Sequence, residues 1–257
     1  MRVSLLLPLL ILAGGCQSLF PTEAGEALAH FEDAAPARGA AIDALGNAGL
    51  VTLDGEQIAL SDLHRERPMV VRLGSLSCPV YRYRRFDFRK LRARYADRVD
   101  FVVIYTQEAH PNGTISPYAD EEWVPWINRL ARVQVPAHGT LTERRERAGD
   151  TRTRFSSTAH YLVDDMRNGN WSTFGEAPAP AFVFDAEGEL VLRQPWVEPK
   201  ALTSVLDALL DIGAQPNELS AGQPGTMQKR LNVSSHAVPD GSDREDDRQP
   251  GPARSRP

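Results

Sequence analysis

One stretch of the sequence limits the fold more than any other, an apolar run that leads through a cysteine and a proline into a helix. Residues 69–73 are typical of a buried strand, and residues 74–77 have the composition of a tight turn before Cys78 and Pro79. Pro79 suits the first position of a helix, where the N–H that it lacks would have no partner. Apolar side chains then recur at helical spacing at Tyr81, Phe88, Leu91 and Tyr95. The sequence therefore predicts a strand, a turn and a helix over about residues 79–95.

The other apolar segments continue the same alternation. Further strands are expected at residues 50–53, 57–60, 101–105, 161–163, 181–185 and 189–193. The first two would form one hairpin and the last two another, which turns at Gly188. Leucines and a valine at helical spacing over residues 202–210 predict a closing amphipathic helix. This order indicates an α/β protein with a thioredoxin-like fold, in which a central mixed sheet is flanked by helices.

The composition excludes several classes of protein. Of the 257 residues, 42% are hydrophobic and 25% are charged, as in ordinary globular chains. Lys and Arg number 29 against 34 Asp and Glu, and a net charge of −5 argues against a dedicated nucleic-acid binder. The two cysteines, Cys16 and Cys78, are too few for a disulfide framework or a cysteine-rich zinc site.

The N-terminus has the features of a secretory signal peptide over residues 1–15. Arg2 supplies a positive charge, and residues 5–13 form an apolar segment that is too short to span a membrane. The small residues before Cys16 resemble the lipobox of bacterial lipoproteins, in which this cysteine is lipidated. With Gln17 after it, we expect an extracytoplasmic lipoprotein on the periplasm-facing side of the outer membrane. The alternative is a secreted protein in which Cys16 is incidental.

Three further segments complete the expected organisation. Residues 16–48 would form an N-terminal linker with a helical segment, and residues 49–212 the thioredoxin-like domain. Residues 213–257 are rich in Pro, Gly, Ser, Asp and Arg, and their scattered apolar side chains predict a disordered tail.

Cys78 is the candidate nucleophile. At the start of a helix it faces unpaired N–H groups and the positive end of the helix dipole, which stabilise a thiolate. We therefore expect a partly exposed thiol with a pKa below the free value of about 8.5. The alternative is a buried cysteine that acts as a small hydrophobic residue. Ser75 and Tyr81 occupy the positions three residues away, so an intramolecular dithiol cycle is excluded.

A second group of polar residues follows the strand at residues 101–105. The carboxyl ends of parallel strands meet at one edge of the sheet, so the segment after Tyr105 should lie near Cys78. Glu108 and His110 are two residues apart and would share a face in extended chain. Such a pair can serve in general acid-base chemistry, and the alternative is a histidine in an ordinary surface loop.

Together these residues resemble the iodothyronine deiodinase family, a group with a thioredoxin fold. The similarity covers about residues 68–212. It is carried by Gly74-Ser75, Cys78-Pro79, Phe86, Leu91, Glu108-Ala109-His110-Pro111, Gly113, His138, Leu141, Asp164-Asp165-Met166, Asn168, Phe174-Gly175 and Pro178.

The resemblance implies reductive dehalogenation, in which a selenocysteine attacks or polarises a carbon-bound iodine. The selenocysteine position falls on Cys78, the assisting carboxylate and imidazole on Glu108 and His110, and a second family histidine on His138. The proline that borders such sites in the cis form falls on Pro178, whereas counting to the hairpin glycine favours Pro180, and the choice stays open. Sulfur in place of selenium predicts slow chemistry.

Two other functions compete with a deiodinase-like oxidoreductase. Ser75 and Cys78 satisfy the short Ser-x-x-Cys element of a one-cysteine peroxidase, although Val71 stands where the fuller peroxiredoxin pattern has proline. The third hypothesis is a non-enzymatic envelope binding module. A Cys78 that is buried and resistant to alkylation would distinguish such a module from the two enzymes.

The remaining expectations concern neighbours and ligands of the site. Arg82, one turn after Cys78, would hold the thiolate or attract an anionic substrate, or else belong to a solvated helix face. No cofactor is expected, and Leu76 stands where many animal enzymes carry a second cysteine, so the reductant should be an external thiol. The expected partners are a small electrophile and, through Cys16, the membrane, but not nucleic acid. Whether the chain forms a homodimer stays open.

Overall fold

The computed structural model describes residues 22–46 and 49–212, with the backbone alone for residues 22–27. The expected signal peptide over residues 1–15, the lipidation site at Cys16 and the tail over residues 213–257 lie outside the described residues. Within the described part, no helix combines the length and apolar character needed to cross a membrane.

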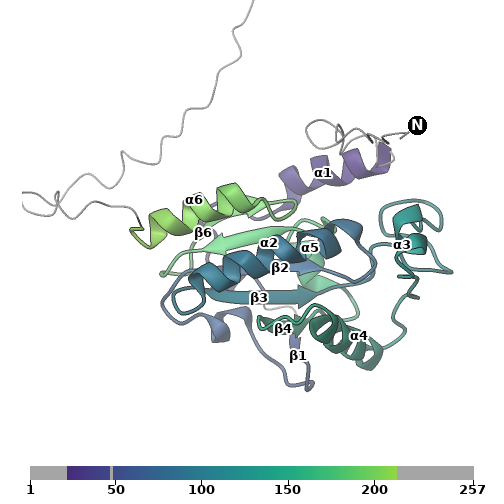
Figure 1. Cartoon of the computed structure of the whole chain (residues 1–257), viewed down its shortest axis with the longest axis horizontal. Helices are drawn as coiled ribbons and strands as arrows, with labels where there is room; N and C mark the ends of the chain where they lie inside the picture. The colour runs from purple at the N-terminus through teal and green to yellow at the C-terminus, as the bar shows by residue number, and fades with distance from the viewer. Residues whose placement is uncertain (1–21, 47–48, 213–257) are drawn as a thin grey trace, which may run out of the picture. The chain divides into compact units, whose positions relative to one another are not determined.

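A mixed sheet of six strands forms the centre of the fold, and helices lie on both sides of it (Figure 1). The strand order is β1-β4-β3-β2-β5-β6. The strands are β1 (Val51–Thr52), β2 (Met69–Gly74), β3 (Asp100–Tyr105), β4 (His160–Val163), β5 (Ala181–Phe184) and β6 (Leu190–Gln194). Strands β2, β3 and β4 run parallel, and β1, β5 and β6 pair antiparallel to their neighbours. The predicted α/β class with a central mixed sheet is confirmed.

The helices divide the core into two hydrophobic clusters, one on each face of the sheet. The helices are α1 (Thr22–Ala34), η2 (Ile42–Ala44), η3 (Leu60–Leu63), α2 (Pro79–Tyr95), α3 (Trp126–Leu130), α4 (Leu141–Arg154), α5 (Gly169–Thr173) and α6 (Pro199–Leu209). Side chains of α2, α4 and α6 pack with Val70, Phe101 and Val183 on one face. Side chains of α1 and of the segment after it pack with Val71, Ile104 and Phe182 on the other face.

The C-terminal end of α1 is attached to β6 and to the core. Phe31 is fully buried, and its ring centroid lies 6.0 Å from that of Phe182. The Arg193 guanidinium donates hydrogen bonds to the carbonyls of Ala35 and Glu32, both at 2.8 Å. The segment predicted from sequence as an N-terminal linker with a helical part therefore contributes an ordered helix, α1, to one face of the sheet.

The first predicted hairpin is only partly confirmed. Val51 and Gln57 form a single bridge, and the main partner of β1 is β4. The expected second strand is not extended to its end because Leu60 begins the short helix η3 instead. The helix predicted over about residues 79–95 and the hairpin that turns at Gly188 are confirmed, the latter as β5 and β6.

Gly74, the last residue of β2, allows α2 to lie close to the sheet. Its φ is +151°, and a Cβ at this position would lie 2.3 Å from Cδ2 of Tyr81. Real Cβ contacts are longer than this, so only glycine lets the first turn of α2 lie over the strand end without displacement of the Tyr81 ring.

We expect Gly74→Ala to lower the free energy of unfolding by roughly 2–4 kcal/mol, because backbone strain and the clash with Tyr81 add together. Gly113→Ala is the matched control, since Gly113 has φ +79° but no atom within 4 Å of the position that a Cβ would take. The control should show the strain alone, roughly 1 kcal/mol. Urea unfolding of both variants measures the difference, and equal losses would contradict the close approach of Tyr81 to Gly74.

Candidate active site

Cys78 is the N-cap residue of α2, as the sequence predicts. The Tyr81 N–H donates a hydrogen bond to its sulfur at 3.4 Å, and the Cys78 N–H donates to the Ser75 carbonyl at 3.3 Å. Pro79 occupies the first helical position. The turn from β2 into α2 therefore directs the thiol toward the carboxyl end of the sheet, where it lies at the start of the helix.

The thiol itself differs from the expectation. Cys78 is only 1% exposed, and its burial raises the pKa of the thiol above its ordinary value. The N–H groups of Tyr81 and Val80 and the charges of Arg82 and Arg72 act in the opposite direction and do not offset the loss of solvation. The prediction of a partly exposed thiol with a lowered pKa is thus wrong, because desolvation outweighs the effect of the helix N-terminus.

A small cavity of about 50 Å³ adjoins the sulfur. Its walls are mainly apolar and aromatic, and those that matter most here are Cys78, His110, Tyr118, Trp123, Pro178 and Trp196. Leu28 of α1 forms a further part of the wall. The thiol and one imidazole are therefore enclosed together among aromatic rings.

Glu108 lies beside the turn that carries Cys78 and is buried. Its carboxylate accepts hydrogen bonds from the Ser77 N–H at 2.8 Å and from the Tyr105 hydroxyl at 2.6 Å. His138 Nε2 lies 3.4 Å from Oε1 of the same carboxylate. Burial alone would raise the pKa of Glu108, but the hydrogen bonds from His138, Ser77 and Tyr105 together lower it. The carboxylate therefore stays ionised near neutral pH.

His110 does not form the expected pair with Glu108. Its Nδ1 lies 3.1 Å from the Trp123 carbonyl, and its ring packs edge to face on the Trp123 ring with centroids 4.4 Å apart. The carboxylate pairs instead with His138, whose side chain is 3% exposed and packs against Tyr105. The two histidines thus have different partners, because the loop turns between residues 108 and 110 rather than staying extended.

The environment of His110 fixes its protonation state. Burial lowers the pKa of His110 to about 4, which outweighs the hydrogen bond to Trp123, so the ring is neutral at pH 7. A carbonyl only accepts, so Nδ1 carries the proton that is shared with Trp123. The other nitrogen of the ring, Nε2, is then a proton acceptor on a wall of the cavity.

Two serines join the turn before Cys78 to the loop after β3. The Ala109 N–H donates to Ser75 Oγ at 3.0 Å, and the His110 N–H donates to Ser77 Oγ at 2.9 Å. Ser75, expected to border the site, therefore fixes the backbone on which the site is built.

Arg82 stabilises the same turn, the one before Cys78, through hydrogen bonds. Its guanidinium donates to the Leu76 carbonyl at 2.7 Å and to Asn128 Oδ1 at 2.5 Å, and Asn128 Nδ2 donates to the Ser77 carbonyl at 2.7 Å. Arg82 is 8% exposed, so it does not belong to a solvated helix face. Its charge lowers the pKa of Cys78, as expected, but both of its acceptors are structural.

The two prolines occupy different places. Pro178 lines the cavity beside Cys78, whereas the Pro180 carbonyl accepts a hydrogen bond from the Leu73 N–H at 3.0 Å within the sheet. Pro178 therefore borders the sulfur. Which of the two has a cis peptide bond stays a prediction.

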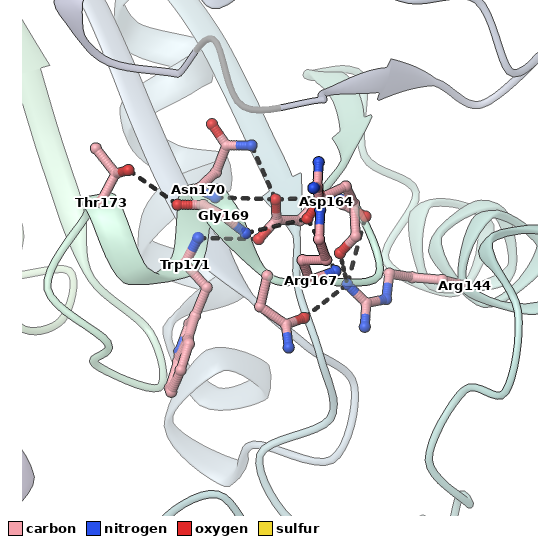
Figure 2. Close-up of polar contacts among 9 residues, drawn as sticks. Arg144, Asp164, Arg167, Gly169, Asn170, Trp171 and Thr173 are labelled. Atoms are coloured by element: carbon pink, nitrogen blue, oxygen red, sulfur yellow. Dashed lines mark hydrogen bonds and ion pairs between the residues drawn. The ribbon is translucent and has the colours of Figure 1, made fainter.

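A buried aspartate, Asp164, is connected to one wall of the cavity through Trp171. The Asp164 carboxylate accepts hydrogen bonds from Asn170 Nδ2 at 2.8 Å and from the Trp171 N–H at 2.9 Å (Figure 2). Arg144 approaches the same loop from α4 and donates to the Asp165 carbonyl at 2.5 Å. Trp171 Nε1 in turn donates to the Tyr118 hydroxyl at 3.0 Å. The loop after β4 thus positions Tyr118 in the cavity wall.

Sequence reasoning missed Leu28, Tyr118, Trp123 and Trp196. The three aromatic residues lie in segments without a regular apolar period, and Leu28 lies in the stretch interpreted as a linker with a helical segment, outside the predicted domain. The only signal in the sequence was the presence of Trp123 and Trp196, since a solvent-exposed loop seldom carries so large an apolar ring.

Strand β2 leads to a buried cysteine at the start of helix α2, and Pro178, shortly before β5, borders the sulfur. This arrangement defines the molecule as a thioredoxin-like thiol protein. A family model for iodothyronine deiodinase matches residues 29–193, more than half of the chain. The chain therefore belongs to the iodothyronine deiodinase family, and the resemblance seen in the sequence is confirmed.

Characterised relatives match part of the chain. Thyroxine 5-deiodinase of Sparus aurata is 28% identical over 127 residues, which cover 49% of this chain and 43% of the relative. Thyroxine 5-deiodinase of Gallus gallus is 28% identical over 131 residues, which cover 50% of this chain and 46% of the relative. The chain thus spans less than half the length of these relatives.

Solved structures were matched as well. A conserved protein of Geobacillus kaustophilus has a TM-score of 0.47 at 16% identity, over 68% of this chain and 82% of that one. A secreted disulfide oxidoreductase of Mycobacterium tuberculosis has a TM-score of 0.41 at 15% identity, over 62% of this chain and 92% of that one.

The lowered pKa of His110 predicts that acid destabilises the fold. Above pH 6.5 the imidazole is neutral in both folded and unfolded chains and has no effect. Between pH 6.5 and about 4 the unfolded chain binds the proton more readily, so the free energy of unfolding falls, by up to roughly 3 kcal/mol. In His110→Asn this part of the pH dependence should vanish, as measured by urea unfolding at each pH. Identical pH profiles for both proteins would contradict the burial of a neutral imidazole.

Proposed function

We propose that this chain is an extracytoplasmic, thiol-dependent oxidoreductase that removes a halogen from an aromatic substrate. The observation that carries the proposal is the enclosure of the Cys78 sulfur and the neutral His110 ring in one cavity with aromatic walls. Family membership supports thiol-dependent redox chemistry at this position. The extracytoplasmic location rests on the sequence of residues 1–16, which lie outside the described residues.

The first step consumes one thiol and one carbon–halogen bond. His110 Nε2 takes the proton of Cys78 only as the sulfur begins to bond to the halogen, because an imidazole with a pKa of about 4 does not hold that proton at rest. A thiolate rather than a thiol is the nucleophile. As the sulfur bonds to the halogen, the carbon–halogen bond breaks, and its electron pair stays on the ring carbon. That carbon takes the proton back from His110. The arene is reduced, and the sulfur is oxidised to a sulfenyl halide.

The second stage restores the thiol with two molecules of an external thiol. The first attacks the Cys78 sulfur, releases halide and a proton, and leaves a mixed disulfide. The second attacks that disulfide, frees Cys78 and leaves as the oxidised reductant. Cys16 is the only other cysteine of the sequence, so no neighbouring thiol can perform this step along α2.

Glu108 acts on the sulfur indirectly, through the neighbouring residue Ser77. Its carboxylate holds the Ser77 N–H, next to Cys78 in the chain, and is itself held by Tyr105 and His138. We assign it the role of a positioning residue that keeps the turn before α2 in one conformation. The His138 ring, whose Nε2 lies 3.4 Å from Oε1, helps this carboxylate remain charged in a buried place.

The dimensions of the cavity favour a small aromatic halide. A space of about 50 Å³ is smaller than the roughly 150 Å³ that encloses benzene in an engineered protein cavity. It accommodates a halogen and the edge of a ring, and the tryptophan and tyrosine walls provide aromatic contacts for that edge. We therefore propose a ring whose halogenated edge enters first, with the rest of the molecule outside.

The structure bears on the non-enzymatic alternative too. Burial of Cys78 meets the first half of the criterion for a binding module, and resistance to alkylation is the second half. The cavity beside the sulfur distinguishes this cysteine from one packed solidly in the core.

The test uses the purified full chain with excess dithiol and an iodophenol. Wild-type protein should release iodide, Cys78→Ser should release none, and His110→Ala should be slower by about 10²- to 10⁴-fold, because proton transfer is lost. His160→Ala is the matched control, since His160 is exposed on β4 and outside the cavity, and its rate should equal that of the wild type.

Two other outcomes would overturn the proposal. Rapid oxidation of Cys78 by peroxide to a trappable sulfenic acid, without iodide release, would identify a peroxidase. Neither reaction, together with a thiol that resists alkylation, would identify a binding module.

A further inference from the structure

Arg72 is a buried charged residue inside an otherwise apolar strand. It lies in β2 on the same face as Val70, which packs in the cluster that α2 covers, and it is only 2% exposed. Its strand neighbours Val71 and Leu73 belong to the cluster on the opposite face. The guanidinium therefore lies beneath the first turns of α2, on the side of the sheet that carries Cys78.

The contacts of Arg72 leave its charge without an anionic partner. Its NH2 group donates to the Tyr81 carbonyl at 2.5 Å, and its guanidinium carbon lies 4.1 Å from the centroid of the Tyr81 ring. Its Nε has no hydrogen-bond partner in the part of the chain that the structure describes. Among residues 28–46 and 49–212, no carboxylate lies within ion-pair distance of this guanidinium. Burying an unpaired cation is costly, so a function of the charge must be sought nearby.

Tyr81 joins Arg72 to the reactive sulfur. Its carbonyl accepts from Arg72, while its N–H donates to Cys78 Sγ at 3.4 Å. The backbone carbonyl of Tyr81 thus contacts the cation, and the backbone N–H of the same residue contacts the thiol. The electrostatic coupling has the expected sign, because the charge of Arg72 lowers the pKa of Cys78 and an ionised Cys78 raises that of Arg72.

We propose that Arg72 is a positioning residue that serves, beside Arg82, as a buried counter-charge of the Cys78 thiolate. This inference rests on the proposed role of Cys78 as the reactive thiol. It explains how a sulfur enclosed in an apolar cavity reaches its ionised form often enough to react. The guanidinium lies below the helix and does not line the cavity, so it leaves the space for the substrate free.

Among the other ionisable groups around the sulfur, only Arg82 also favours the thiolate. Arg82 lowers the pKa of Cys78 more than Arg72 does, but its guanidinium also holds the Leu76 carbonyl and Asn128, so its loss would disturb the turn before α2 as well as the charge. His110 is neutral at pH 7. The phenols of Tyr81, Tyr118 and Tyr161 have pKa values raised by burial, so they carry no charge there. Glu108 carries the opposite sign, and its carboxylate is bound by Ser77, Tyr105 and His138.

The closing experiment measures the ionisation of Cys78 directly, as the rate of alkylation by iodoacetamide against pH in the full chain. Arg72→Gln removes the charge and keeps a donor for the Tyr81 carbonyl. We expect its thiol pKa to rise by about one unit, so alkylation at pH 7 falls roughly tenfold. Arg72→Lys keeps the charge and should stay near the wild type.

Arg144→Met is the matched control. Arg144 is also 2% exposed, donates to backbone carbonyls and has an Nε without a partner among the described residues, but it approaches the loop after β4 rather than α2. Its loss should cost stability without moving the thiol pKa. An unchanged pKa in folded Arg72→Gln, or an equal shift in Arg144→Met, would overturn the inference.

A second measurement leaves Arg72 in place in case Arg72→Gln does not fold. In the ¹⁵N-arginine-labelled full chain, the Nε resonance of Arg72 should titrate with the pH midpoint of Cys78 alkylation, and in Cys78→Ser it should not titrate. A resonance that is flat in the wild type would overturn the inference. Neither measurement depends on halide release, so the proposed dehalogenation and the role of Arg72 can fail separately.

Discussion

The parallel pairing of β2 with β3 is the constraint on which the whole site depends. Gly74 pairs with Tyr105, so both strands end at the same level and the turn toward α2 meets the loop that follows β3. Ser75 and Ser77 accept backbone N–H groups of that loop, and Glu108 accepts the Ser77 N–H in return. A thiol, a carboxylate and an imidazole are thus brought together by backbone hydrogen bonds between two loops rather than by contacts among the functional groups themselves.

Two opposing electrostatic effects act on this centre. A helix N-terminus and nearby cations favour the thiolate, whereas the apolar surroundings of the cavity disfavour every charged form within it. The pKa values of Cys78 and His110 move in opposite directions as a result, up for the thiol and down for the imidazole. Both groups are therefore neutral at rest, and the proton moves between them only when the reaction requires it. Glu108 is the exception, because the Ser77 N–H, the Tyr105 hydroxyl and the neighbouring His138 ring together keep it ionised.

The sequence predicted what depends on local order. Pro79 and the apolar spacing that follows it define α2, and the short Val- and Ile-rich segments define the strands that position Cys78. Burial of the sulfur could not be predicted, because it depends on Trp123 and Trp196, which come from distant segments. The partner of Glu108 was missed for the same reason, since His138 follows a long irregular stretch and reaches the carboxylate only in the folded chain.

Leu28 gives the site a property beyond its chemistry. This residue closes part of the cavity from α1, one turn before the point where Phe31 and Arg193 fix that helix to the core. Leu28 therefore covers one side of the cavity that Cys78 lines, so a helix far from the cysteine in the sequence contributes directly to the apolar surroundings of the thiol.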